Sequence, residues 1–232
     1  VLMDVALHRA GVTFVLDRAG ITGDDGASHN GMWDLAMLRI VPGLHLATPR
    51  DEETLRSALR TAVEIDDAPS VVRYPKGALA EPLPAIDSLD GVDVVARAEP
   101  RARRRTGAAR RVLVVGFGSM ARTALETVEI LGEHEVAATA VSPTWVLPMP
   151  EALVKLVGDH DLVVTIEDGL AEGGLGALLA ERAITAGLRT PVHRVGLPTA
   201  FLDHAARDVI VREHRMGAAD VARDVLDTLR DA

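Results

Sequence analysis

The sequence contains no cysteine, and this absence excludes three kinds of chemistry at once. Disulfide bonds, thiol nucleophiles and thiolate metal ligands all require cysteine. A protein without disulfides suits a reducing compartment. We therefore expect a cytoplasmic protein whose stability comes from its hydrophobic core.

The chain also lacks an excess of positive charge and any long apolar run. Its formal net charge of −9 argues against nucleic acid as the main partner. No apolar stretch reaches the roughly 18 to 20 residues that a membrane-spanning helix needs. The first residues lack the basic and apolar regions of a signal peptide, so we expect no membrane partner. They look instead like the end of an amphipathic helix, which suggests a piece of a longer chain.

What remains is a chain of 232 residues, 48% of them apolar, in which strand and helix patterns alternate. This alternation predicts an α/β fold of two three-layer units with mostly parallel sheets. We expect a first unit over residues 1–85, a linker and basic loop over 86–110, and a second unit over 111–232. Strands are expected at 12–16, 44–47, 70–74, 92–96, 112–115, 136–141, 162–166 and 192–195. Helices are expected at 1–10, 32–39, 48–65, 120–131, 150–157, 174–186 and 218–229.

The stretch from Asp17 to Gly31 carries the most chemical information. It follows an apolar strand and contains glycines, acids, Arg18 and His29. Open α/β sheets place ligand sites at such strand ends. The spacing of Asp25 and His29 lets both side chains face one ligand. Arginine offers a planar donor fork, so we expect an anionic ligand here, with a satisfied loop histidine as the alternative.

A second strand end adds two cations. Val72-Arg73-Tyr74-Pro75-Lys76-Gly77 follows the strand expected at 70–74. If that strand lies beside the strand at 12–16, Arg73 or Lys76 could reach the same anion. A structural salt bridge is the alternative for each of these two residues.

Three other motifs have ordinary explanations. Gly116-Phe117-Gly118-Ser119-Met120-Ala121 has the outline of a dinucleotide fingerprint, but the next strand ends without the expected acid, so a tight strand–helix turn is favoured. Glu167, Asp168 and Glu172 could bind a metal, but a turn and a glycine-rich helix start at a subunit contact are favoured. The basic run Arg101–Arg105 lacks aromatic partners and is interpreted as a solvated loop.

Five histidines are treated as structural or surface residues: His8, His45, His193, His204 and His214.

Taken together, these residues resemble a known family. Asp17-Arg18-Ala19-Gly20-Ile21-x-Gly23-x-Asp25-Gly26-x-x-His29-x-Gly31-x-x-Asp34-Leu35 is similar to the 1-deoxy-D-xylulose-5-phosphate synthases, thiamine-diphosphate enzymes of the transketolase superfamily. Leu38-Arg39-x-x-Pro42, Pro49-Arg50-Asp51-Glu52 and the Arg73–Gly77 stretch follow in the expected order. The second unit resembles the transketolase C-terminal domain. The resemblance implies part of a pyrimidine-binding domain followed by a C-terminal domain.

The resemblance also implies a reaction and roles for five residues. Pyruvate would lose CO2 and its remaining two-carbon unit would join D-glyceraldehyde 3-phosphate, the first step of non-mevalonate isoprenoid synthesis. Arg18 and Arg73 would hold the acceptor phosphate, and Lys76, where many relatives have arginine, could act as a point charge. Asp25 and His29 would orient substrate hydroxyl and carbonyl groups. His29 would also be the catalytic proton relay, since histidine titrates near neutrality.

The same resemblance implies what this sequence does not contain. The residues that bind thiamine diphosphate and Mg2+ are expected mostly before Val1, in a missing N-terminal segment, so the chain alone should be inactive and no metal ligands are assigned to it. The whole enzyme would be a homodimer. Another superfamily member, a transketolase or a 2-oxoacid dehydrogenase E1 beta subunit, is the enzymatic alternative. A catalytically idle assembly module is the alternative from a different class.

Overall fold

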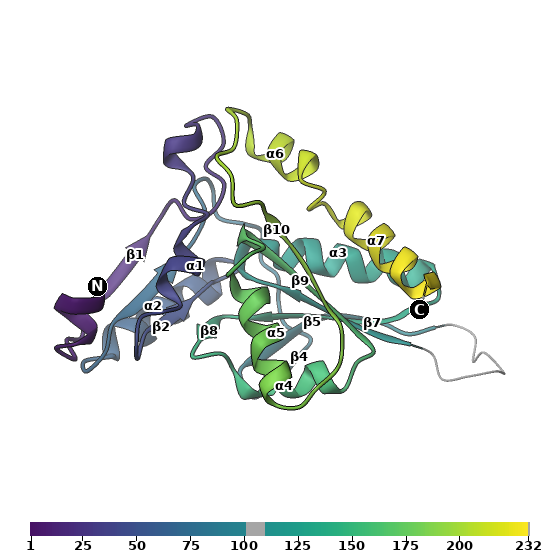
Figure 1. The fold of residues 1–232 in the computed structure, drawn as a ribbon, viewed down its shortest axis with the longest axis horizontal. Helices are drawn as coiled ribbons and strands as arrows, with labels where there is room; N and C mark the ends of the chain where they lie inside the picture. Colours follow the sequence, from purple (N-terminus) through teal and green to yellow (C-terminus); the bar gives the residue numbers. More distant parts are fainter. Residues whose placement is uncertain (101–109, 232) are drawn as a thin grey trace.

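A strand from the second half of the chain completes the sheet of the first half. The computed structural model describes residues 1–100 and 110–231, and its first sheet has the strand order β1-β3-β2-β8 (Figure 1). β1 (Thr13–Leu16), β3 (Ser70–Arg73) and β2 (His45–Ala47) run parallel. β8 (Trp145–Leu147) pairs antiparallel with β2. The two halves therefore share a sheet.

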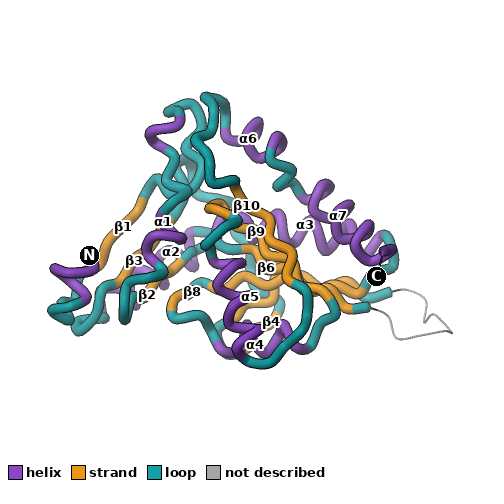
Figure 2. The backbone as a smooth tube through the Cα atoms, in the orientation of Figure 1, coloured by secondary structure: helices purple, strands orange, loops and turns teal. Residues whose placement is uncertain are grey.

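The second sheet has six strands in the order β10-β9-β6-β7-β5-β4. β10, β9, β6 and β7 are parallel, and β5 and β4 extend the sheet antiparallel at one edge. Figure 2 shows this sheet as the long set of strands on the C-terminal side of the molecule. The strands are β4 (Asp87–Leu89), β5 (Val92–Ala98), β6 (Arg111–Gly116), β7 (Ala137–Pro143), β9 (Leu162–Leu170) and β10 (Val192–Leu197).

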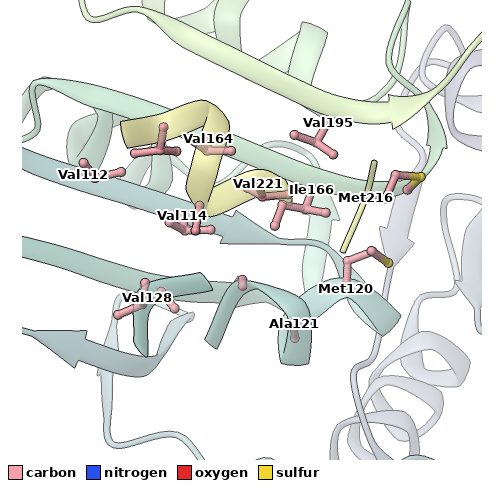
Figure 3. Close-up of a cluster of buried hydrophobic side chains, with 14 of the residues drawn as sticks. Val112, Val114, Met120, Ala121, Val128, Val164, Ile166, Val195, Met216 and Val221 are labelled. Atoms are coloured by element: carbon pink, nitrogen blue, oxygen red, sulfur yellow. The ribbon is translucent and has the colours of Figure 1, made fainter. Parts of the chain in front are cut away.

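Helices cover both faces of the second sheet, because its strands are apolar on both sides. In β6, Val112 and Val114 belong to a cluster with α3 and α7, drawn in part in Figure 3. Leu113 and Val115 face the opposite way, toward α4 and α5. The helices of this unit are α3 (Ala121–Glu133), α4 (Glu151–Gly158), α5 (Leu175–Thr185), α6 (Arg207–Glu213) and α7 (Ala218–Asp231), with a 3-10 turn, η3 (Gly118–Met120).

The first sheet packs differently. One face is covered by α2 (Glu52–Glu64), whose Ala58 and Ala62 contact Val72. The other face, with Leu46 and Val71, enters the same apolar cluster as α4, α5 and β6. The remaining short elements are η1 (Leu2–Ala6), η2 (Ala27–His29) and α1 (Asp34–Leu38). The predicted α/β class with mostly parallel sheets is confirmed, and residues of both units pack together in two apolar clusters.

The structure differs from the sequence interpretation at a few elements. The strand expected at 92–96 is present as β5, but the segment 86–110, expected to be a linker and loop, also contains β4, and both strands belong to the second sheet. The helix expected over residues 1–10 is only the single turn η1. β8 and α6 were not predicted. The basic run Arg101–Arg105 lies outside the described residues. In the part of the chain that the structure describes, no helix is long and apolar enough to cross a membrane.

Candidate functional site

The polar loop, residues 17–31, leaves the end of β1, and hydrogen bonds hold it both internally and to neighbouring segments. The Ala19 amide donates to the Tyr74 carbonyl at 3.0 Å, which ties the loop to the end of β3. The Gly31 amide donates to the Gly20 carbonyl at 2.8 Å and closes the loop. Inside it, the buried Asn30 Oδ1 accepts from both the amide and the hydroxyl of Thr22. The polar side chains thus project from a rigid frame.

Two cations converge on Asp25 at the surface of this loop. Lys76 Nζ lies 2.7 Å and Arg18 Nη1 lies 3.2 Å from the same Asp25 Oδ2 atom. The hydrogen bond from Lys76 is the largest cause of a lowered pKa at Asp25, which keeps this carboxyl ionised. The two cations remain partly exposed, at 40% and 55% of their side chains. Their positive charge is therefore available to an anionic ligand.

His29 stands on the same loop, at the end of the short turn η2. Its ring Nδ1 lies 3.1 Å from the hydroxyl of Ser28, and its side chain is exposed. Its charge is near enough to contribute to the lowered pKa of Asp25. The turn is possible because Gly26, which precedes it, has a φ of 83°. Arg18, Asp25, Lys76 and His29 therefore form one exposed polar group, hereafter the loop cluster.

Arg73 is not part of the loop cluster, although it lies three residues from Lys76. Its side chain is 5% exposed, and its Nε lies 2.7 Å from Asp34 Oδ2. Its Nη2 donates to the main-chain carbonyl of Asp168 at 3.1 Å. Of the two cations at the end of β3, Lys76 reaches the Asp25 side of the site and Arg73 is occupied inside the protein.

The acidic strand end at Glu167 and Asp168 is a structural junction. Both residues lie within β9, which continues to Leu170, so the turn expected at Glu167 begins later. Glu167 accepts from the amides of Leu175 and Gly176 at 2.8 and 2.9 Å, and the glycine-rich helix start is confirmed as the N-terminus of α5. Burial raises the pKa of Glu167 to about 7, against these two amide bonds, which lower it.

Asp168 joins the polar loop to the second unit. Its Oδ1 accepts the amide of Ile21 at 3.0 Å, and its Oδ2 lies 2.5 Å from Arg207 Nη1. No group of three or more histidine or acidic residues that could hold a metal ion occurs among the described residues. Glu167 therefore accepts hydrogen bonds from backbone amides, and Asp168 accepts one from a backbone amide and forms an ion pair with Arg207.

The remaining motifs have mainly structural surroundings. A side chain at Gly116 would come within 2.6 Å of the Met120 carbonyl, which confirms the tight strand–helix turn. His45 stacks edge-on against Trp145 with ring centroids 6.4 Å apart. His8 and His193 are exposed, and His214 is half-buried.

The sequence interpretation assigned no contacts to two residues at this site: Asp34 and Arg207, which contact Arg73 and Asp168 respectively. His204, treated above as a structural or surface residue, is exposed and lies next to Gly26 of the polar loop. The two partners in each of these contacts are separated by 39 to about 180 positions in the sequence. Only the buried placement of Asp168 on an apolar strand could have suggested such a role.

The loop cluster suits some ligands better than others. Two partly exposed cations and a carboxylate match a phosphate or carboxylate that also carries hydroxyl groups. The described residues provide no set of carboxylates for a magnesium ion beside a diphosphate. Among the described residues, the loop cluster therefore has the chemistry to bind an anionic ligand that carries hydroxyl groups.

Comparison with known proteins identifies the class of protein that this fold and site define. Residues 1–82 match the pyrimidine binding domain of transketolase, and residues 101–221 match the transketolase C-terminal domain. The chain therefore belongs to the transketolase family. Membership in this family implies dependence on thiamine diphosphate.

Within the family, the chain resembles the 1-deoxy-D-xylulose-5-phosphate synthases. It is 54% identical to the synthase of Kocuria rhizophila over 97% of the chain, and 51% identical to that of Parafrankia sp. over 99%. It covers 34% of each of these relatives, about a third of their length.

Two solved structures share the fold. A split-gene transketolase, described as an inactive beta4 tetramer, has a TM-score of 0.75 at 26% identity; 94% of this chain and 67% of that one are covered. A transketolase mutant from Pichia stipitis has a TM-score of 0.73 at 17% identity, covering 97% of this chain and 31% of that one, and supports the fold alone.

Proposed function

We propose that this chain forms the C-terminal part of a 1-deoxy-D-xylulose-5-phosphate synthase and binds the acceptor substrate there. The enzyme would condense pyruvate, with loss of CO2, and D-glyceraldehyde 3-phosphate. The observation that carries this proposal is the loop cluster, in which Arg18 and Lys76 share one carboxylate oxygen of Asp25 and remain partly exposed. The 48–54% identity to synthases over nearly the whole chain supports the same assignment.

In this proposal each member of the loop cluster has a task. Arg18 and Lys76 bind the phosphate of the aldehyde, and their charge is set in place by Asp25 before the ligand arrives. Asp25 accepts hydrogen bonds from substrate hydroxyl groups, because its lowered pKa keeps it ionised. The exposed ring of His29 moves a proton at the substrate oxygen. Arg73 contributes through the main chain of Asp168 and the side chain of Asp34, which it holds.

The complete enzyme supplies what the described residues do not. Bound thiamine diphosphate would supply the electron sink that the decarboxylation needs. We assign its ligands and those of Mg2+ to a segment outside this chain, and we infer that the chain alone is inactive. A homodimer in the cytoplasm is the expected form of the complete enzyme.

A substrate comparison tests the proposed function. The complete enzyme should turn over pyruvate with D-glyceraldehyde 3-phosphate and should show little activity with ketose phosphate donors. Preference for ketose donors would assign the chain to a transketolase, and the proposal would be wrong. Replacing D-glyceraldehyde 3-phosphate by D-glyceraldehyde, which lacks the phosphate, should raise the KM strongly, because Arg18 and Lys76 would lose their ligand.

A second candidate function rests on one of the solved structures. The split-gene transketolase that shares this fold is described as an inactive beta4 tetramer, formed by a chain of which this one covers 67%. In that protein, therefore, a chain with this fold forms a tetramer that is inactive. If the present chain occurs separately in the cell, an assembly role would follow, and size measurement of the native chain would detect it.

A further inference from the structure

A single ion pair from the second unit binds the backbone amide and the backbone carbonyl of one residue in the polar loop. Asp168 Oδ1 accepts the amide of Ile21 at 3.0 Å, and Arg207 Nη1 donates to the carbonyl of Ile21 at 3.0 Å. The two charged groups meet each other at 2.5 Å, between Arg207 Nη1 and Asp168 Oδ2. Both backbone polar groups of Ile21 are therefore satisfied by the same pair of side chains.

This contact is well shielded from water. The Asp168 side chain is 2% exposed, and Ile21 is 1% exposed with its side chain in the core of the second unit. Arg207 is 31% exposed, and its Nη2 also lies 3.4 Å from the hydroxyl of Ser119. Charge-assisted hydrogen bonds in such surroundings are stronger than neutral ones. Removing the Arg207 charge leaves the Asp168 carboxylate buried without its partner.

The shape of the polar loop is adapted to this contact. Gly20 has a φ of +73°, and a Cβ atom there would come within 2.2 Å of the Asp168 carboxyl group. Gly23 and Gly26 also have positive φ, and side chains there would meet the Arg207 amide at 3.2 Å and the His204 ring at 2.8 Å. Three glycines thus let the loop rest directly on Asp168 and on residues 204–207.

The position of Ile21 makes this contact relevant to the loop cluster. Arg18 precedes Ile21 by three residues and Asp25 follows it by four. Arg73 adds a third connection, because it donates to the Asp168 carbonyl from the end of β3, the strand end that leads to Lys76. Asp168 consequently connects both segments that carry the loop cluster to the second unit.

We propose that Asp168 and Arg207 are positioning residues that hold the polar loop in the geometry needed to bind the phosphorylated aldehyde. The inference rests on the proposed function and assigns it two residues outside the loop cluster. Neither residue is expected to touch the substrate. Their loss should therefore weaken aldehyde binding, because the loop cluster is displaced, and should leave the use of pyruvate unchanged.

The chain offers a matched control for the test. Arg50 is 5% exposed, and its Nη1 lies 2.7 Å from Asp93 Oδ2, so this pair also joins the first unit to the second. It does not contact the polar loop in any hydrogen bond or ion pair among the described residues. Arg50→Gln should lower thermal stability as Arg207→Gln does, without moving the loop cluster.

The experiment compares Arg207→Gln, Asp168→Asn, Arg207→Lys and Arg50→Gln in the complete enzyme. We expect Arg207→Gln and Asp168→Asn to raise the KM for D-glyceraldehyde 3-phosphate about tenfold or more, with the KM for pyruvate within about twofold of wild type. Arg207→Lys keeps one cationic donor near Asp168 and should restore most of the loss. Arg50→Gln should leave both KM values within about twofold.

Hydrogen exchange gives a second readout that does not depend on the reaction. Amides of residues 19–31 should exchange faster in Arg207→Gln than in wild type and Arg50→Gln. Unchanged exchange, equal rises in both KM values, or the same kinetic change in Arg50→Gln would overturn the positioning role. If wild-type enzyme fails to use pyruvate and D-glyceraldehyde 3-phosphate, the proposed function is wrong, and the exchange data still decide whether Arg207 holds the loop.

Discussion

The Nε atom of Arg73 lies 2.7 Å from Oδ2 of Asp34, and both side chains are largely shielded from water. The pair fixes the end of β3 against α1, because Asp34 is the first residue of that helix. Lys76, three residues later, is 40% exposed and contacts Asp25 instead. Arg73 is thus buried in an ion pair, whereas Lys76 is exposed at the loop cluster. We therefore expect different effects when each of these side chains is removed.

Arg73→Met should destabilise the fold, and Lys76→Met should not. Breaking a buried ion pair costs about 3 kcal/mol or more, whereas an exposed pair contributes about 1 kcal/mol or less. Urea unfolding of the chain measures the first effect, and the KM for D-glyceraldehyde 3-phosphate in the complete enzyme should rise with Lys76→Met. If Arg73→Met keeps full stability and raises this KM more than Lys76→Met does, Arg73 contacts the phosphate itself.

The pKa of Glu167 predicts a pH dependence of stability. Its value is raised to about 7 in the fold from an ordinary value of 4.5, because the carboxyl group is fully buried. The folded state therefore binds more protons than the unfolded state between these two values, and this contribution to stability is complete below pH 4.5 and lost as pH rises to 7. The loss between pH 5 and pH 8 is about 2 kcal/mol.

Glu167→Gln distinguishes the pH-dependent stability due to Glu167 from that due to all other titratable groups. The amide keeps one acceptor for the start of α5 and cannot ionise. The free energy of unfolding of wild type minus that of the variant should be about 2 kcal/mol larger at pH 5 than at pH 8. A difference that is constant with pH, measured by urea unfolding, would show that Glu167 keeps the same charge in both states.

Much of the fold could be predicted because its elements have strong local patterns. β6 contains the apolar run Val112–Val115, β9 begins with the apolar residues Leu162–Val164, and α7 has one apolar face. β8 could not be predicted, because it has three residues and owes its existence to pairing with β2, about 100 residues earlier. β5 was predicted as a strand at 92–96, whereas β4, a strand of three residues that follows Pro82 and Pro84, was not.

The candidate site was predictable only where its residues are neighbours in the sequence. Arg18, Asp25 and His29 share one loop, so a common site could be expected from spacing. The environment of Arg73 depends on Asp34 and Asp168, and nothing local indicates which of two nearby cations will be buried. The contact of Asp168 with Arg207 could not be predicted either, because these two residues lie 39 positions apart in the sequence.

Calorimetry should detect no binding of thiamine diphosphate with Mg2+ to this chain alone. The described residues contain no group of carboxylates and histidines that could hold the metal ion, and the diphosphate would lack its counterion. The complete enzyme, titrated in the same buffer, is the positive control. Tight binding by the chain alone would refute the assignment of the cofactor ligands to another segment.

His29→Ala should abolish most turnover in the complete enzyme while the fold remains intact. The side chain is exposed and its contact is with the neighbouring Ser28, so its removal should change stability by less than about 0.5 kcal/mol. A lost proton relay should lower kcat about a hundredfold or more. His134→Ala, at the exposed end of α3, is the matched control and should keep wild-type turnover. Unchanged turnover in His29→Ala would remove His29 from the catalytic machinery and leave the loop cluster with a binding role alone.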